Sequence, residues 1–85
     1  MDKVALVTGG GSGIGEAAAL AFARAGYRVA ISGRRDSELA RVADRIRAAG
    51  GEALAVPADV SRAADVERMV AAPLSAWGRL DAAFN

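Results

Sequence analysis

The feature that most constrains this sequence is a glycine-rich segment, residues 8–15 (TGGGSGIG), set between an apolar run and an alanine-rich stretch. The apolar run Val4–Val7 is typical of a strand buried on both faces, as in a parallel sheet. The stretch Ile14–Ala25 is good helix material, and Gly26 is placed to end that helix. The segment therefore predicts a strand, a tight loop and a helix in direct succession.

The same alternation continues to the end of the chain. Further strands are predicted for Tyr27–Ser32, Ala53–Val56 and Leu80–Phe84, with helical stretches between them. The order β-α-β-α-β-α-β, with helices of ten or more residues, implies right-handed crossovers and a parallel sheet. We therefore predict an α/β fold with no linker and no second domain.

Each of the two later helices has one apolar face at helical spacing. Asp36 or Ser37 is the expected N-cap of the first, which Gly50-Gly51 ends, and Ser61 is the expected N-cap of the second. Pro73 lies inside the second helix, where we expect a surface kink or a restart of the helix. The expected apolar faces are Leu39, Val42, Ala43, Ile46 and Ala49 in the first, and Val66, Met69, Val70 and Trp77 in the second, which Gly78 ends.

Composition excludes several kinds of site. The 85 residues include no cysteine and no histidine, so the chain has no disulfide, no zinc site of the usual kind and no Ser-His nucleophile. Eleven basic and ten acidic residues are spread along the chain, which argues against a nucleic-acid partner. With no membrane-length apolar run and no signal peptide, we expect no membrane partner and a cytoplasmic location.

The glycine-rich segment has the position and composition of a pyrophosphate site. Glycines let the backbone turn sharply and approach a ligand, and the following helix directs free N–H groups and its positive end at an anion. The pattern G-x-G-x-x-G is present only in its looser form, Gly13-x-Gly15-x-x-Ala18. A P-loop is excluded because no Gly-Lys-Ser/Thr is present. A glycine-rich turn without a ligand is the alternative.

Three motifs in order resemble those of the short-chain dehydrogenases/reductases. Residues 8–15 resemble the signature T-G-x-x-x-G-I-G, residues 58–60 (Ala-Asp-Val) the family's Asp-Val step, and residues 78–85 the run into its Asn-Asn-Ala-Gly motif. The resemblance covers the whole chain and implies an incomplete, Rossmann-type doubly wound sheet with strand order 3-2-1-4. Residues 1–85 would then be the N-terminal part of a single dinucleotide-binding domain, truncated at Asn85.

The resemblance implies an NAD(P)-dependent oxidoreductase that transfers hydride reversibly between a nicotinamide cofactor and an alcohol or carbonyl substrate. This chain would carry the cofactor-binding half only. No catalytic residue can be assigned, because nothing matches the family's serine or Tyr-x-x-x-Lys pair; Tyr27 is followed four residues later by Ile31. We therefore expect the chain alone to be inactive and its parent protein to be a homo-oligomer. The alternatives are a catalytically inert dinucleotide-binding fragment and another Rossmann-fold enzyme.

Individual site residues also follow from the resemblance. Asp59 would bind the adenine amino group, with a plain turn aspartate as the alternative, and Asn85 would reach the ribose by its backbone and brace the sheet by its side chain. Thr8 is expected to be structural, Asp81 a solvated or helix-capping charge and Trp77 part of the core. The expected cofactor-binding residues are Gly9, Gly11, Ser12, Gly13, Ile14, Gly15, Ser32, Arg34, Arg35, Asp59, Val60 and Asn85, and no metal ligands are expected.

The end of the second strand predicts a preference for NADP over NAD. NAD enzymes of this fold hold the ribose hydroxyls with an Asp or Glu about 20 residues beyond the glycines. The matching position, 18 residues after the last glycine of the loop, is Gly33, and the forked donors Arg34 and Arg35 follow it. An arginine just after that position resembles the pattern of NADP users in the family. Some NADP users also have a basic residue just before the middle glycine, but here that position is Ser12. The alternative to an NADP site is that both arginines are merely solvated.

Overall fold

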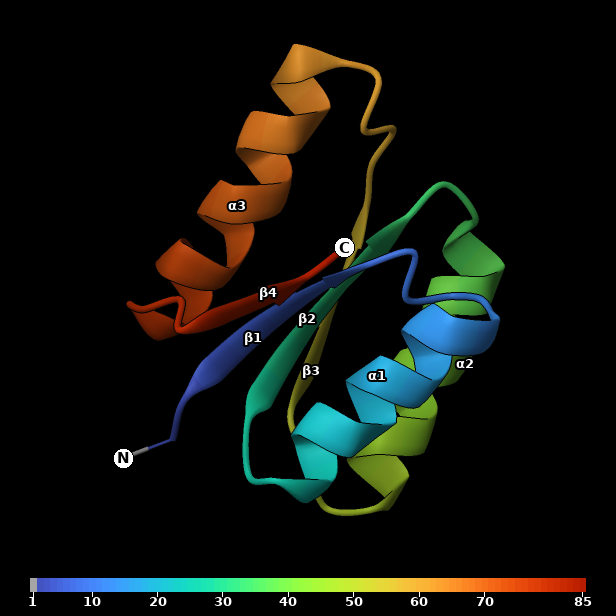
Figure 1. Cartoon of the computed structure of the whole chain (residues 1–85), viewed down its shortest axis with the longest axis vertical. Coiled ribbons are helices and arrows are strands. Elements are labelled where there is room, and N and C mark those ends of the chain that lie inside the picture. Colours follow the sequence, from blue (N-terminus) through green and yellow to red (C-terminus); the bar gives the residue numbers. More distant parts are fainter. Residues whose placement is uncertain (1) are drawn as a thin grey trace.

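Strands and helices alternate from one end of the chain to the other (Figure 1). The computed structural model describes residues 2–85. Its four strands form one sheet of order β3-β2-β1-β4, in which every neighbouring pair is parallel. The predicted doubly wound α/β sheet and its strand order are therefore confirmed. The elements are β1 (Val4–Thr8), α1 (Gly13–Arg24), β2 (Arg28–Gly33), α2 (Asp36–Ala48), β3 (Ala53–Pro57), α3 (Ala63–Trp77) and β4 (Ala82–Phe84).

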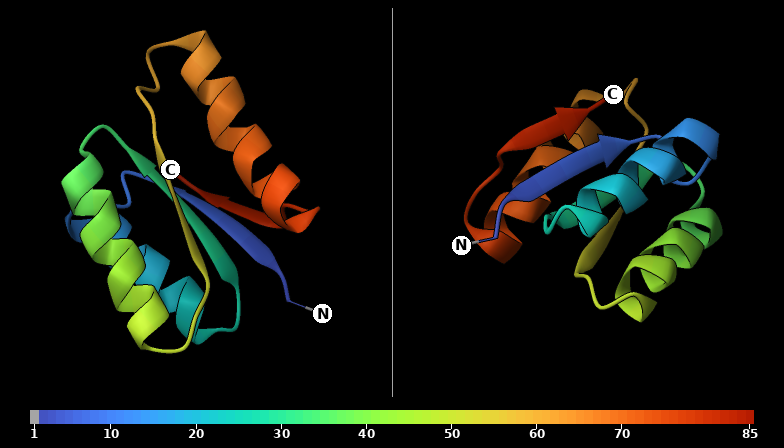
Figure 2. Two further views of the ribbon diagram at one scale, coloured as in Figure 1. Left: turned by 180° about the vertical axis from the view of Figure 1, so that it is seen from behind. Right: turned by 60° about the horizontal axis from the view of Figure 1, so that its bottom comes forward.

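The sheet is covered on both faces, by α1 and α2 on one side and by α3 on the other (Figure 2). Alternate residues of a central strand serve the two cores. Val7 of β1 and Ile31 of β2 pack in the core with α1 and α2. Their neighbours Leu6 and Ala30 pack in the core with α3. Both faces of these strands are buried, which explains why their sequences are continuously apolar.

The N-caps of α2 and α3 differ from those expected. The N-cap residues are Arg35 and Arg62, and neither makes a side-chain capping bond. Asp36 is already helical and acts through its charge in the first turn, where a carboxylate favours the positive end of the helix. Ser61 lies one residue before the N-cap of α3, and its hydroxyl donates to the Asp59 carboxylate at 2.7 Å.

Two predictions about helix interiors are wrong as well. Ala49 is the exposed C-cap residue of α2, not part of its apolar face. The helix α3 runs through Pro73 without a restart, and Pro73 is fully buried, so it is not a surface kink. Its burial, on the same helical face as Met69 and Trp77, offsets the backbone bond that proline removes. Trp77 packs in the α3 core, as predicted, and Gly78 ends α3 in the left-handed conformation.

Asp81 ties the start of β4 to the start of β1. Its Oδ2 accepts the Val4 N–H at 2.8 Å, and its carboxylate receives Arg79 at 2.7 and 2.8 Å. The Asp81 N–H in turn donates to the Val4 carbonyl at 2.8 Å. Asp81 is thus an exposed charge, as expected of a solvated one, but it bonds Val4 and Arg79 and caps no helix. The Arg79 guanidinium, followed by the Val4 N–H, lowers the pKa of Asp81 below its ordinary 3.8.

This depressed pKa predicts a loss of stability in acid. A carboxyl group whose pKa is lower in the folded than in the unfolded protein stabilises the fold fully at a pH above its unfolded pKa. This stabilisation is lost as the pH falls through the pKa of the folded protein. We therefore expect Asp81→Asn to be less stable than the native protein at neutral pH, and the difference to narrow well below pH 3.8. Urea unfolding followed by circular dichroism at the two pH values measures both differences. If the two proteins differed in stability as much in acid as at neutral pH, the charge of Asp81 would not contribute to the stability of the fold.

Candidate dinucleotide-binding site

An open cleft of about 980 Å³ lies where all four strands reach their carboxyl ends. The strand order reverses here, since β2 and β4 lie on opposite sides of β1, and ligands of open α/β sheets bind at such a switch point. The lining residues are Thr8, Gly9, Gly11, Ser12, Gly13, Ser32, Gly33, Arg34, Arg35, Glu38, Leu39, Arg41, Ala58, Asp59, Val60, Ser61 and Asn85.

The structure brings ten of the twelve expected cofactor-binding residues to this cleft. The two others, Ile14 and Gly15, do not line it. The side chain of Ile14 is exposed outside the cleft, whereas Gly15 is buried beneath the loop. The expected residues that line the cleft are Gly9, Gly11, Ser12, Gly13, Ser32, Arg34, Arg35, Asp59, Val60 and Asn85.

Gly15 lets the first turn of α1 pass directly under the loop. A Cβ atom at this position would lie 1.8 Å from the carbonyl oxygen of Gly9, a distance that no side chain tolerates. Gly15 therefore shapes the loop by close packing rather than by lining the cleft. The loop is also held to the sheet, because the Gly10 N–H donates to the Ser32 carbonyl at 3.1 Å.

The start of α1 is open to an anion. Ser12 is its N-cap residue and makes no side-chain capping bond; its hydroxyl lies 3.5 Å from the Gly9 carbonyl instead. An uncapped helix start leaves N–H groups of the first turn without intrahelical partners, and the positive end of the helix favours negative charge there. Ser12 and Gly13 both line the cleft, so this helix end borders it.

Two side chains at the strand ends have structural bonds. The Thr8 hydroxyl lies 2.8 Å from Asn85 Oδ1 and 3.3 Å from the Phe84 carbonyl, which joins β1 to the end of β4. The expected structural role of Thr8 and the bracing by the Asn85 side chain are thus present. Ser32 lines the cleft, but its hydroxyl is buried and donates to the Val56 carbonyl at 2.8 Å. Ser32 therefore uses its proton to join β2 to β3.

Asp59 presents one carboxylate oxygen to the cleft region while the other is bound. Oδ1 accepts the Ser61 N–H at 2.9 Å and the Ser61 hydroxyl at 2.7 Å. Oδ2 lies 4.0 Å from Arg34 Nη1. The bonds from Ser61, together with the more distant charge of Arg34, lower the pKa of Asp59. The carboxylate is therefore ionised at neutral pH, with Oδ2 placed to accept a further donor.

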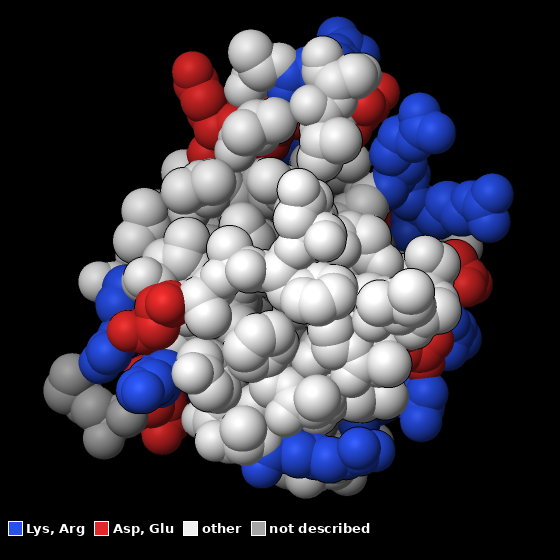
Figure 3. Space-filling view, viewed as in Figure 1, with Lys and Arg blue, Asp and Glu red and all other residues white. Residues whose placement is uncertain are grey.

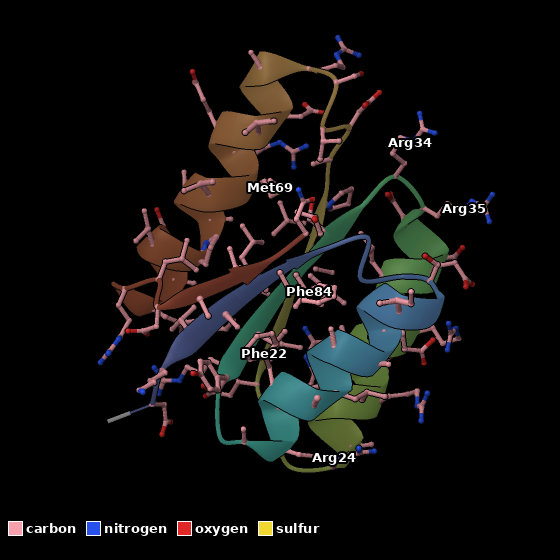
Figure 4. All side chains as sticks on the ribbon, in the orientation of Figure 1. Phe22, Arg24, Arg34, Arg35, Met69 and Phe84 are labelled. Atoms are coloured by element: carbon pink, nitrogen blue, oxygen red, sulfur yellow. The ribbon has the colours of Figure 1, made fainter. Side chains whose placement is uncertain are left out.

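Arg34 and Arg35 extend from the tip of β2 at the entrance of the cleft. Figure 4 shows both side chains pointing away from the body of the protein, and Figure 3 shows basic side chains projecting from that side. The Arg34 side chain is 77% exposed, and Arg35 has no ion-pair partner within residues 2–85. The two guanidinium groups thus stand at the cleft with most of their donors free.

Two charged cleft residues, Glu38 and Arg41, were missed by the sequence analysis. Both come from α2, and their i, i+3 spacing, which places two side chains on one face of a helix, was the available signal. Arg41 donates to Glu38 Oε1 at 3.3 Å and makes a two-pronged contact with Glu16, at 3.0 and 3.1 Å. These bonds raise the pKa of Arg41, and the Arg41 and Arg45 guanidiniums lower the pKa of Glu16. The remaining lining residues that were not expected, Gly33, Leu39, Ala58 and Ser61, flank the predicted ones.

Within residues 2–85 the structure groups no three acidic, histidine or cysteine side chains in a way that could hold a metal ion. No helix of this part of the chain is both long and apolar enough to cross a bilayer.

Curated relatives share the sequence along the whole chain. A γ-butyrolactone 1'-reductase of the A-factor type, 1S-forming, from Streptomyces virginiae is 48% identical over 84 residues, which is 99% of this chain but 33% of that protein. The short-chain dehydrogenase/reductase homolog YusS of Bacillus subtilis is 43% identical over 86 residues. The match includes 100% of this chain and 79% of that protein. The chain thus spans about a third of the first relative and most of the second.

Solved structures share the fold. A short-chain dehydrogenase/reductase from Burkholderia phymatum, in complex with NAD, superposes with a TM-score of 0.94 at 39% identity, over 96% of this chain and 29% of that one. An alcohol dehydrogenase from Thermococcus sibiricus, complexed with 5-hydroxy-NADP, gives 0.91 at 37% identity, over 98% and 36%. The family model described as short chain dehydrogenase matches residues 3–85. The chain therefore belongs to the short-chain dehydrogenase/reductase family.

Proposed function

We propose that the cleft binds a nicotinamide dinucleotide and that the protein is an oxidoreductase acting between an alcohol and a carbonyl compound. The observation that carries the proposal is the uncapped start of α1 beneath a glycine loop, in one cleft with the ionised Asp59 and the exposed Arg34. That solved relatives were captured with NAD and with 5-hydroxy-NADP supports it. When bound, the nicotinamide ring supplies or accepts the hydride.

The residues present fit the adenosine and pyrophosphate half of such a cofactor. The close packing at Gly15 brings loop backbone to the helix start, where N–H groups can hold a pyrophosphate. Asp59 Oδ2 can accept from the adenine amino group, and Val60 is 62% exposed beside it in the cleft. Asn85 lies at the end of β4, where its backbone can reach a ribose. We propose that residues 1–85 form this part of a single dinucleotide-binding domain.

We further propose that the cofactor is NADP rather than NAD. Gly33 ends β2 without a carboxylate, so nothing at that position accepts bonds from ribose hydroxyls or repels a phosphate. Arg34 and Arg35 follow it with free, forked donors at the cleft entrance, which suits a phosphate on the adenosine ribose. Ser12 lies in the glycine loop and can also contact this phosphate. The Ser32 hydroxyl, in contrast, already donates its proton to the Val56 carbonyl.

Arg34→Ala tests this preference. We expect the native protein to bind NADP more tightly than NAD. Arg34→Ala should weaken NADP binding by about tenfold or more, because a hydrogen bond to a charged group contributes about 1.5–3 kcal/mol. The affinity for NAD should change by less than about twofold. Isothermal titration calorimetry of the complete gene product with each cofactor measures the affinities. Arg24→Ala is the matched control, since Arg24 lies at the far end of α1 (Figure 4). NAD binding as tight as NADP binding, or equal losses for both cofactors, would contradict the assignment.

A second candidate function is dinucleotide binding without catalysis. The observation in its favour is that this chain covers 79% of the Bacillus subtilis homolog, so a family relative of little more than this length exists. An assay of the complete gene product with oxidised and reduced cofactor and a panel of alcohols and ketones separates the two functions. Turnover supports the oxidoreductase; tight cofactor binding without turnover supports the binding protein.

A further inference from the structure

Four charged side chains link α1 to α2 beside the cleft: Glu16, Glu38, Arg41 and Arg45. We call them the α1–α2 charge cluster. Glu16 accepts two bonds from Arg41, at 3.0 and 3.1 Å, and one from Arg45. Arg41 also donates to Glu38 at 3.3 Å. Two carboxylates and two guanidiniums are thus bonded in sequence, and the cluster as a whole is neutral.

Only half of the cluster faces the cleft. Glu38 and Arg41 line it, whereas Glu16 and Arg45 do not. Glu38 lies directly against the glycine loop, since a Cβ atom on Gly11 would be 3.0 Å from its Cβ. Glu38 therefore stands beside the loop, and it lines the same cleft as Arg34. Left unpaired, its charge would repel a phosphate bound by that arginine.

Arg41 compensates this charge, and Glu16 determines where Arg41 lies. The Glu16 side chain is 16% exposed, so its carboxylate is held against the protein, whereas the Arg41 side chain is 46% exposed and needs a partner to fix it. The two-pronged contact sets the plane of the guanidinium, and the Nη2 atom shared with Glu16 is the one that reaches Glu38. Arg41 is thus fixed toward Glu38 rather than left free in the cleft.

We propose that Arg41, positioned by Glu16, is a specificity-determining residue that neutralises Glu38 and thereby lets a dinucleotide with a phosphate on its adenosine ribose bind at Arg34. The inference rests on the proposed dinucleotide-binding function. It predicts that the ion pair matters for NADP, which carries a phosphate on the adenosine ribose, and hardly for NAD, which has hydroxyls there. Glu16 acts only through Arg41 and is a positioning residue.

Arg41→Leu and Arg45→Leu form the matched pair for the test. Both remove an arginine bonded to Glu16, but only Arg41 touches Glu38 and lines the cleft. We expect Arg41→Leu to weaken NADP binding by about tenfold, because an uncompensated like charge is then left near the phosphate, and to change NAD binding by less than about twofold. Arg45→Leu should change neither. Adding Glu38→Gln to Arg41→Leu should restore most of the NADP affinity, because it removes the exposed charge.

Calorimetric titration of the complete gene product with NADP and with NAD gives all the affinities, and circular dichroism reports folding. Equal losses for both cofactors in Arg41→Leu, or no rescue by Glu38→Gln, would show a structural role only and overturn the proposal. If Arg41→Leu does not fold, Glu38→Gln alone decides: it should tighten NADP binding severalfold without affecting NAD, and weaker NADP binding overturns the proposal. A native protein that binds neither cofactor overturns the proposed function itself, and this inference with it.

Discussion

Gly15→Ala is expected to remove most of the stability of this fold. The added methyl group would lie 1.8 Å from the Gly9 carbonyl oxygen and 2.5 Å from its carbon, both backbone atoms of the loop that cannot move as a side chain does. Relieving this overlap requires α1 to separate from the loop, and overpacking of this kind costs about 3 kcal/mol or more. A domain of this size has a total stability of only about 5 kcal/mol, so the variant should lose more than half of it. Thermal and urea unfolding measure the loss.

Gly33→Ala is the control for this prediction. It adds the same methyl group to a glycine that does line the cleft, where the Cβ would be 3.5 Å from Leu39 Cδ2, an ordinary van der Waals contact. We expect its unfolding midpoint to stay close to that of the native protein. A Gly15→Ala variant as stable as Gly33→Ala would contradict the close packing of α1 under the loop.

Ile31→Ala is expected to produce the second large effect, on stability and on the cleft together. Ile31 is fully buried in the core that β1 and β2 form with α1 and α2, and its neighbour Ser32 accepts the Gly10 N–H that holds the glycine loop. Truncating a buried isoleucine to alanine costs about 2–5 kcal/mol, through lost burial and the cavity left behind. Urea unfolding followed by circular dichroism should show a lower midpoint, and the variant should also bind dinucleotide more weakly because the loop loses its support.

Ile14→Ala makes the same chemical change at an exposed site. The Ile14 side chain is 78% exposed at the first turn of α1, so we expect its loss to change the free energy of unfolding by less than about 0.5 kcal/mol. Similar losses in the two variants would mean that Ile31 does not hold the core as described.

Stability and site are coupled in this fold through the strand ends. The walls of the cleft are the ends of β1 and β2, the residues that follow β3 and β4, the start of α1 with the loop before it, and the first half of α2. Bonds between strand ends, such as Thr8 to Asn85 and Ser32 to Val56, join neighbouring strands where the cleft begins. A change that loosens the sheet therefore also alters the cleft.

The sequence by itself determined the order of the elements and the place of the site. Strand runs, helical spacing and the glycine segment are local patterns, and each acts within a few residues of itself. The parallel sheet followed because helices separate every pair of strands. The position of the cleft followed in turn, because the strands of a parallel sheet end on the same side. Even the strand order 3-2-1-4, which came from the family resemblance, is confirmed.

Only the tertiary structure decided which polar side chains have partners. Asp81 bonds Val4, 77 residues away, and Glu16 bonds Arg41, 25 residues away, so neither contact leaves a trace in local spacing. The N-cap of α3 was mispredicted as well: the N-cap residue is Arg62, and the hydroxyl of Ser61 bonds the Asp59 carboxylate instead of a helix N–H. Burial of Pro73 and the closeness of Glu38 to the glycine loop likewise depend on how helices lie on the sheet. A hydrogen bond forms with the nearest suitable partner in space, and that partner is known only once the chain has folded.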